Sequence, residues 1–563
     1  MLFVELVRYL EKLEGTSSRL AITDILVELL KKLGQEEVEK AVYLMLGELA
    51  PKFRKKEFNM AEKMVIRAIA RVAGKGEAEI TSAYKVSGDL GQVVQKVTGI
   101  QESKLSINEV YDRLERIAQD GGQGSQERKV EALADLLKEV DPLSAKFTTR
   151  IVLDKLRLGF SDKTILDALS VLDQGNKLAR KKLDNAYQIY PDVGRLAKAV
   201  CDNGVANLEN TVMVEVGVPV EPALCQRLNS SAEIIEKMGE VGVEQKFDGT
   251  RVQIHFERGK GVRTFTRNLD ETSQMFPELK GMEGFVEAQS LILDSEAVGV
   301  DLKSGRLLLF QETIKRKRKH EVEETALQIP LRFYVFDVLY YNGESTINKP
   351  YFERRKLLES IIFPNKTLVV DVTVKTGDAV VLHQAHERFL SEGFEGAVIK
   401  KWDGKYLPGR QGWNWVKIKE SEGTTGKLTD TLDLVVMGYN RGRGKRASFG
   451  IGAFLAGIRS GEEILTITKV GTGLTDDLFR ELKSRLDRLV VREKPREYIV
   501  DKNLAPDVWV EPKLVVEIAA DELTKSPLHT AGVALRFPRL VKFRDDKDLA
   551  GVTTMEEIGG LER

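Results

Sequence analysis

The spacing of apolar residues divides the chain into three segments. Up to about residue 216, apolar positions recur at helical spacing, as in "AITDILVELLKKLG" and "AEKMVIRAIARVAG", and these two runs end in glycine. No alternating strand pattern and no fixed repeat period interrupts this rhythm. The first segment, residues 1–216, is therefore predicted to be an all-helical domain.

Strand and helix patterns mix in the second segment, residues 217–420. Pro219 and Pro222 lie close together at its start and indicate a linker or a first strand. Apolar and polar residues alternate from Arg251 to Phe256, which is typical of a half-buried strand. Further strands are predicted at residues 262–266, 290–298, 331–341, 396–400 and 415–419. This segment is predicted to be an α+β domain.

The third segment, residues 421–563, is predicted to be a small β-domain. The polar stretch "ESEGTTGKL" (420–428) before it indicates a hinge. Beyond the hinge, "LDLVVMGYNRGRGKRASFGIGAFLAGIRS" predicts two strands joined by a basic, glycine-rich loop, and "EILTITKVGTG" and "KLVVEIAADEL" predict more strands.

Composition excludes several classes of protein. The chain of 563 residues is 42% hydrophobic and 31% charged, and it contains no run of 18 apolar residues, so no membrane span is expected. The N-terminus resembles neither a signal peptide nor a transit peptide. The low count of two cysteines favours a reducing, cytoplasmic location, and two cysteines cannot form a four-cysteine zinc site. Lys+Arg and Asp+Glu both number 86, so any case for nucleic acid must rest on local patches.

Lys246 in "EQKFDGTRVQIH" is the candidate nucleophile. A free lysine has a pKa near 10.4, so only roughly one in 2,500 is a neutral amine at pH 7. Burial and nearby cations lower that pKa, and a lysine activated in this way forms covalent intermediates. Phe247 and Arg251 supply an apolar neighbour and a second cation, whereas Asp248 favours the ammonium but is placed to orient it. A solvated lysine in a surface turn is the alternative.

Other charged residues indicate a phosphate and metal site. Lys417 and Lys419 are predicted on one face of a strand, where an anion between them would offset their repulsion, although a solvated face is the alternative. Glu296 and Glu395, in or beside predicted strands, indicate a hard cation, with Mg²⁺ expected first. Phe336 lies in an apolar run and fits either core packing or stacking under a base. The basic run 314–320 is predicted to be a solvated face, with contact to a polyanion as the alternative. The arginines of "ALRFPRLVKFRDDKD" fit either phosphate contacts or a salt-bridged surface.

Seven of these stretches, taken in order, resemble the motif series of the covalent nucleotidyltransferases, and most closely an ATP-dependent DNA ligase of the archaeal and eukaryotic replicative type. The stretches are "KFDGTR", "TRN", "DSEAV", "FYVFDVLYYNG", "EGAVIK", "WVKIK" and "LRFPR". The helical stretches "GSQERKVEALADLL" and "RIVLDKLRLGF" also resemble the family's DNA-binding domain. The resemblance implies a helical DNA-binding domain (1–216), an adenylation domain (217–420) and a β-barrel OB-fold domain (421–563).

The resemblance implies an enzyme that seals nicks in duplex DNA with ATP and Mg²⁺, or Mn²⁺ in its place, in replication, repair and recombination. By similarity, Lys246 attacks the α-phosphate of ATP and holds AMP, which then passes to the 5′-phosphate at the nick before the 3′-hydroxyl displaces it. The implied nucleotide-binding residues are Glu244, Arg251, Arg267, Glu296, Phe336, Arg410, Lys417, Lys419, Arg536 and Arg539, and the implied metal ligands are Glu296 and Glu395.

Arg410 is included because Gln411 stands where the family often has a basic residue. Nicked duplex DNA is the expected partner of a monomeric protein active at the nucleoid, and binding to a sliding clamp stays open because "QESKLSI" (101–107) lacks the paired aromatic residues of a clamp motif. The alternatives are an RNA ligase, a capping-type nucleotidyltransferase and a catalytically silent DNA-binding protein. The helical first segment argues against the first two, and the presence of the nucleophile argues against the third.

Overall fold

The computed structural model describes the chain except residues 100–102, 157, 229, 302, 309, 314–315, 317–321, 420–430, 443–445, 447–448, 472–473, 521 and 562–563. The predicted hinge at 420–428 lies outside the described residues, as does the basic run at 314–320 apart from Arg316. The chain forms two compact units, Met1–Lys419 and Glu420–Arg563. Within the described part, no helix is both long enough and apolar enough to span a membrane.

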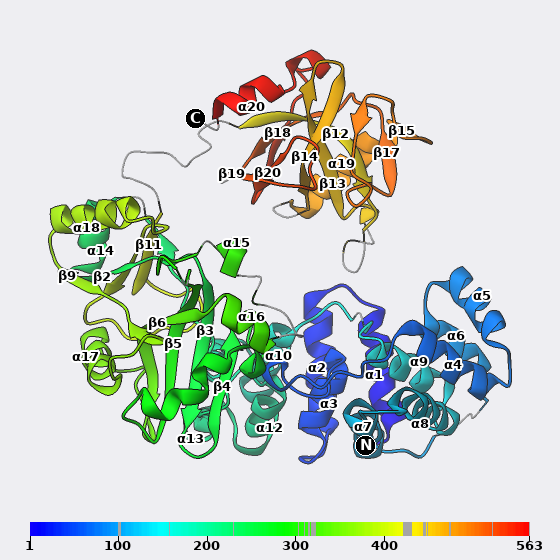
Figure 1. The fold of residues 1–563 in the computed structure, drawn as a ribbon. Helices are drawn as coiled ribbons and strands as arrows, with labels where there is room; N and C mark the ends of the chain where they lie inside the picture. Colours follow the sequence, from blue (N-terminus) through cyan, green and yellow to red (C-terminus); the bar gives the residue numbers. More distant parts are fainter. Residues whose placement is uncertain are drawn as a thin grey trace. The chain divides into compact units, whose positions relative to one another are not determined.

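The first part of the first unit consists of helices, as predicted (Figure 1). Their inward faces form one apolar core from Phe3 to Val218, which Phe265 of the following part joins. The helices are α1 (Phe3–Glu14), α2 (Arg19–Lys32), α3 (Val38–Leu46), η1 (Lys52–Arg54), α4 (Glu62–Ala73), α5 (Glu77–Ser87), α6 (Leu90–Val97), α7 (Ile107–Gln119), α8 (Ser125–Glu139), α9 (Pro142–Val152), α10 (Asp162–Gln174), α11 (Arg180–Ile189), α12 (Val193–Asn203), η2 (Val205–Asn207) and α13 (Leu208–Thr211).

A five-stranded sheet with the order β1-β11-β10-β2-β9 follows. Its strands are β1 (Gln226–Arg227), β2 (Val241–Gln245), β9 (Thr373–Thr376), β10 (Ala397–Lys401) and β11 (Trp415–Ile418). Helices α14 (Ser231–Met238) and α18 (Ala379–Ser391) cover one face of this sheet, where their apolar side chains pack on those of β2, β10 and β11 (Figure 1). Strands β10 and β11 are close to the predicted 396–400 and 415–419.

A second sheet has the order β4-β3-β5-β6-β7, with β8 parallel to β6. Helix α17 (Tyr351–Ile361) packs against one face. The strands are β3 (Thr250–Glu257), β4 (Gly261–Thr266), β5 (Ser290–Gly299), β6 (Leu331–Tyr341), β7 (Glu344–Ser345) and β8 (Leu368–Val370), and the smaller helices are η3 (Ser273–Met275), η4 (Pro277–Gly284), α15 (Phe310–Thr313) and α16 (Val322–Gln328). Strand β6 occupies the predicted 331–341.

Strand β3 is buried on both faces, so the prediction of a half-buried strand is wrong. The segment that was predicted as a linker lies over its polar face. There, Val220 exchanges two hydrogen bonds with the side chain of Gln253, and the Gly217 N–H donates to His255 Nδ1 at 3.0 Å. Burial lowers the pKa of His255 to about 3, so this ring is neutral. The linker is therefore part of the core that holds the second sheet in place.

The second unit is rich in sheet, in agreement with the predicted β-domain. Strand β12 is central and pairs with β13, β17 and β18, and β13 pairs in turn with β14. The elements are β12 (Leu432–Asn440), β13 (Ala453–Ser460), β14 (Glu463–Val470), α19 (Asp476–Asp487), β15 (Val490–Val491), β16 (Tyr498–Ile499), β17 (Val508–Val510), β18 (Val515–Ala519), β19 (Glu522–Lys525), β20 (Val533–Arg536), β21 (Arg539–Phe543), η7 (Leu549–Gly551) and α20 (Met555–Leu561).

Candidate active site

Lys246 lies in the turn between β2 and β3, where the chain passes from the first sheet to the second. Its backbone N–H donates to the Gly396 carbonyl, and its carbonyl accepts from the Glu395 N–H, both at 3.0 Å. The turn also packs closely against β5, because a Cβ added at Gly249 would lie 2.5 Å from the Ala297 carbonyl oxygen. Only glycine permits this close approach.

The Lys246 side chain points into a partly buried site and is 19% exposed. Its ammonium pairs with Glu395, a residue 149 positions away in the sequence. The neighbouring Asp248 is exposed, and the structure therefore assigns the role of counterion to Glu395. This placement excludes the alternative of a lysine solvated in a surface turn.

Glu395 lies between two lysines. Its Oε2 pairs with Lys246 and its Oε1 with Lys419, which follows β11. Burial acts to raise the pKa of Glu395, but the two ammonium groups outweigh it and lower the pKa below its ordinary value. The carboxylate is thus ionised and holds both lysines in place.

Lys417 is the third cation of this cluster. It lies on β11 between the buried Val416 and Ile418, which confirms the predicted alternation of that strand. Burial lowers the pKa of Lys417, and Lys419 and Lys246 lower it further. Three lysines around a single carboxylate leave a net positive charge, which an anion such as phosphate would neutralise.

Glu296 on β5 faces the same cluster. Its pKa is raised to about 7, chiefly by burial and also by Asp294 and Glu395, while Arg251 and Lys246 act in the opposite direction. A buried carboxylate whose pKa is raised in part by two other carboxylates fits a site for a cation. Among the described residues no group of three or more His, Cys, Asp or Glu side chains has metal-binding geometry. Glu296 and Glu395 nevertheless fit Mg²⁺, which takes one or two protein carboxylates with substrate phosphates and water.

Arg251 on β3 is held by a buried carboxylate. Its Nε and Nη2 donate to the two oxygens of Asp294 at 2.9 and 2.6 Å, and its Nη1 donates to the Ala223 carbonyl at 2.6 Å. Tyr406 donates to the same Asp294 at 2.7 Å. The structure therefore fixes the guanidinium next to the lysine cluster, while its contact with ribose and phosphate stays a prediction.

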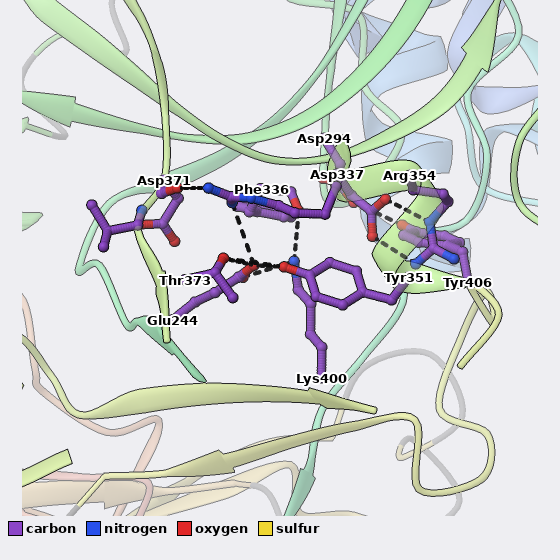
Figure 2. A network of polar contacts seen from close by, with 12 residues as sticks. Glu244, Asp294, Phe336, Asp337, Tyr351, Arg354, Asp371, Thr373, Lys400 and Tyr406 are labelled. Carbon is purple, nitrogen blue, oxygen red and sulfur yellow. Dashed lines mark hydrogen bonds and ion pairs between the residues drawn. The ribbon is translucent and has the colours of Figure 1, made fainter. Parts of the chain in front are cut away.

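Glu244, two residues before the candidate nucleophile, is fully buried and belongs to a polar network (Figure 2). One carboxylate oxygen accepts from Tyr351 and, at 3.2 Å, from Thr373, and the other pairs with Lys400 at 2.7 Å. Phe336 on β6 borders this network, and its carbonyl accepts from Lys400 at 2.6 Å. The structure thus brings together two residues predicted to bind the base.

Four predicted residues are exposed. Arg267 is exposed in the turn after β4, and Arg410 is exposed in the loop before β11. Arg536 ends β20 and Arg539 begins β21, and both are exposed on the second unit. Their contacts with a nucleotide stay predictions. Gln411 donates to Gln188 of α11 and to the Pro408 carbonyl.

Sequence reasoning missed five residues of the site: Asp294, Tyr351, Thr373, Lys400 and Tyr406. Two of them carried a signal, because Lys400 and Asp294 are charged residues within apolar strands, where charge requires a partner. The other three are uncharged, and nothing in their sequence surroundings marks them. Arg316 also differs from the predicted solvated face, because it is 3% exposed and pairs with Glu278 at 2.6 Å.

Family models match most of the chain. Residues 222–419 match the "ATP dependent DNA ligase domain", residues 2–170 the "DNA ligase N terminus", and residues 447–547 the "ATP dependent DNA ligase C terminal region". A probable DNA ligase of Dictyoglomus turgidum is 39% identical and covers 99% of this chain and 97% of its own. A DNA ligase of Saccharolobus solfataricus is 35% identical, with 99% and 96% covered.

A solved structure described as Pmar-Lig_Pre has the same overall fold. It is 17% identical, covers 96% of this chain and 99% of its own, and superposes with a TM-score of 0.55. The similarity extends over the helical part, both sheets of the first unit and the sheet-rich second unit.

Proposed function

Because the chain belongs to the family of ATP-dependent DNA ligases, we propose that Lys246 is the nucleophile through which it activates ATP to seal nicks in duplex DNA. One observation carries this proposal. The Lys246 ammonium lies in a partly buried site with a carboxylate on it and two further lysines beside it. A surface lysine has no need of such surroundings, whereas a nucleophile for a phosphate ester does.

In the first step Lys246 supplies an electron pair. The neutral Nζ forms a bond to the α-phosphorus of ATP, the bond to the bridging oxygen breaks, and pyrophosphate leaves with that bond's electron pair. Glu395, which already pairs with the ammonium, is placed to accept the proton. AMP then passes from Lys246 to the 5′-phosphate of the nick, and attack by the 3′-hydroxyl joins the strand and releases AMP.

The remaining charges of the site serve the phosphates. Lys417 and Lys419 face the position of the α-phosphate and stabilise the negative charge that builds up as the bond to pyrophosphate breaks. Glu296, and Glu395 in its ionised form, would hold Mg²⁺, which would neutralise phosphate charge and lower the barrier to attack. Arg251 is fixed by Asp294 at the edge of this cluster, where it contacts the ribose or the phosphates.

Glu244 and Phe336 bind the adenine, and Arg267 contacts the ribose and the phosphates. Arg410 takes over the contact of the basic residue that Gln411 replaces. Arg536 and Arg539 of the second unit complete the site during adenylation. The helical part, residues 1–216, binds the duplex on either side of the nick. Binding of a sliding clamp stays open, and the monomeric state, activity at the nucleoid and the three domain boundaries stay predictions.

The test is the position of the covalent bond. The full chain is incubated with ATP and Mg²⁺, digested, and searched by mass spectrometry for an AMP-modified peptide. We expect the modification on Lys246 alone, its loss in Lys246→Ala with binding of nicked DNA retained, and its persistence in Lys260→Ala, which removes a solvent-exposed lysine paired with Glu257.

The same preparation separates the alternatives. Sealing of a nicked DNA duplex without sealing of a nicked RNA duplex supports the DNA ligase over an RNA ligase. A folded protein that binds nicked DNA but forms no adduct would be a silent binding protein, and an adduct that survives Lys246→Ala would identify a different nucleophile.

A further inference from the structure

Lys400 on β10 is a fully buried lysine close to the nucleotide site. Its ammonium pairs with Glu244 at 2.7 Å and donates to the Phe336 carbonyl at 2.6 Å. It also lies over three aromatic rings, 4.8 Å from the centroid of Phe336, 4.9 Å from that of Tyr351 and 4.5 Å from that of Trp415. A buried ammonium is costly unless it is paired in this way, and such a cage fixes its position.

This ammonium connects the two sheets of the first unit. Glu244 lies on β2 of the five-stranded sheet, and Phe336 lies on β6 of the other sheet. Figure 2 shows both residues beside Lys400. Lys400 contacts the Glu244 carboxylate and the Phe336 carbonyl at the same time, and its strand, β10, pairs directly with β2. A change at Lys400 therefore alters both residues that the proposed function assigns to the base.

The groups around Glu244 keep its carboxylate an acceptor. Tyr351 and Thr373 donate hydroxyl hydrogens to Oε1, Lys400 pairs with Oε2, and the Arg355 guanidinium lies 3.9 Å away. Asp371 is an acidic neighbour, whose pKa is raised well above its ordinary value by burial and by Glu244. Burial of Asp371 near Glu244 therefore disfavours a second negative charge in the network.

We propose that Lys400 is the positioning residue that sets the enzyme's preference for adenine, by holding Glu244 as an acceptor-only carboxylate beside the ring of Phe336. The inference rests on the proposed function, in which these two residues bind the base. A carboxylate accepts a hydrogen bond from the 6-amino group of adenine. It repels the 6-oxo group of hypoxanthine or guanine, which offers only lone pairs.

Loss of the ammonium has a specific consequence for base selection. In Lys400→Met the side chain keeps its length but not its charge, and the buried Glu244 carboxylate loses its nearest countercharge. It then takes up a proton and becomes a donor as well as an acceptor. A protonated carboxyl group can bind a 6-oxo group, so the discrimination against ITP is expected to fall about tenfold.

The experiment compares nucleotides in the full chain. The rate of Lys246 adduct formation is measured as kcat/KM with ATP, with ITP and with 2′-deoxy-ATP, in the unmodified protein, in Lys400→Met and in Lys401→Met. Lys401 is the matched control because it is the next residue on β10, is partly exposed and has Asp403 as its ion-pair partner at 3.7 Å. We expect the ATP-to-ITP ratio to fall only in Lys400→Met, while the ATP-to-deoxy-ATP ratio stays within about twofold.

An unchanged ATP-to-ITP ratio in Lys400→Met would overturn the inference. An equal fall in the ATP-to-ITP and ATP-to-deoxy-ATP ratios would also overturn it, because it would indicate general loosening of the site. If Lys400→Met does not fold, Glu244→Gln provides a second test. The amide keeps the size of the carboxylate but offers a hydrogen-bond donor, so the ATP-to-ITP ratio should fall in this variant as well. An unchanged ratio in that variant would also overturn the inference. Failure of the proposed function is distinct, because the unmodified protein would then form no adduct at Lys246.

Discussion

At the scale of single residues, the site depends on one carboxylate between two ammonium groups. Glu395 holds Lys246 and Lys419 at the same time, and neither lysine has another ion-pair partner among the described contacts. Opposite charges within hydrogen-bonding distance attract each other, so Glu395 holds the Lys246 side chain in place. Binding of phosphate oxygens by Lys417 and Lys419 would free Glu395 to take the proton from the nucleophile.

Glu395→Gln should therefore slow adduct formation by about a hundredfold or more, since the amide cannot accept that proton or hold both lysines. The measurement is the single-turnover rate of AMP transfer to Lys246. The matched control is Glu392→Gln, which removes an exposed carboxylate at the end of α18 that pairs with Arg388. Equal rates for the two variants would remove Glu395 from the chemistry.

Glu296 gives a prediction for pH. Its pKa in the folded protein is raised to about 7, above the value of 4.5 that it has when exposed. The folded state therefore holds a proton that the unfolded state has released, and stability is lost as the pH rises from 4.5 toward 7. Glu296→Gln escapes this loss. Its urea midpoint should exceed that of the unmodified protein at pH 8 and converge with it at pH 5, and a constant difference would contradict the shifted pKa.

At the scale of elements, strongly patterned segments could be predicted from the sequence, but contacts between distant segments could not. The apolar run of β6 and the alternation of β11 gave the correct strands because burial on a sheet leaves a local pattern. The polar alternation of β3 gave a wrong exposed face. Its cover is the segment at 217–220, whose backbone supplies hydrogen-bond partners that no local pattern reveals.

The same limit applies to the site. The motif around Lys246 could be recognised locally, but its counterion follows 149 residues later, and only the pairing of β2 with β10 brings the two together. For Lys400, in contrast, the sequence carried a local signal but the contacts again came from distant segments. A lysine within the apolar stretch "GAVIK" was a visible signal, and its aromatic cage depends on β6, β11 and α17.

Gly396 directly precedes β10, and a substitution there tests whether this strand positions Lys246. Its φ is +132°, and an added Cβ would lie 2.1 Å from the Ile418 carbonyl oxygen. Gly396→Ala should therefore cost about 1–3 kcal/mol and slow adduct formation, because the Gly396 carbonyl accepts from Lys246. Gly393→Ala is the control: its φ is also positive, at +90°, but an added Cβ meets nothing within 4 Å. Urea unfolding and adduct rates that match in the two variants would refute this role.

At the scale of the whole molecule, the two compact units have separate cores. Each buried apolar cluster of the described residues lies within a single unit. Four clusters consist of residues up to 419, and two consist of residues beyond 430. The lysine cluster, Glu296 and the Lys400 network all lie in the first unit. The second unit contributes Arg536 and Arg539, which the sequence resemblance assigns to the adenylation step.

Removal of the second unit separates folding from chemistry. A chain ending at Lys419 keeps every core cluster and every ion pair of the first unit, so its thermal unfolding should resemble that of the first unit in the full chain. Adduct formation should nevertheless fall by about a hundredfold, because two cations expected to act on the departing pyrophosphate are missing. The full chain with Arg536→Ala and Arg539→Ala should show the same loss, whereas Arg492→Ala, which changes an exposed arginine elsewhere on the second unit, should not. If the shortened chain forms the adduct at the full rate, the first unit alone carries the adenylation chemistry, and the role of the second unit must lie in the later steps on DNA.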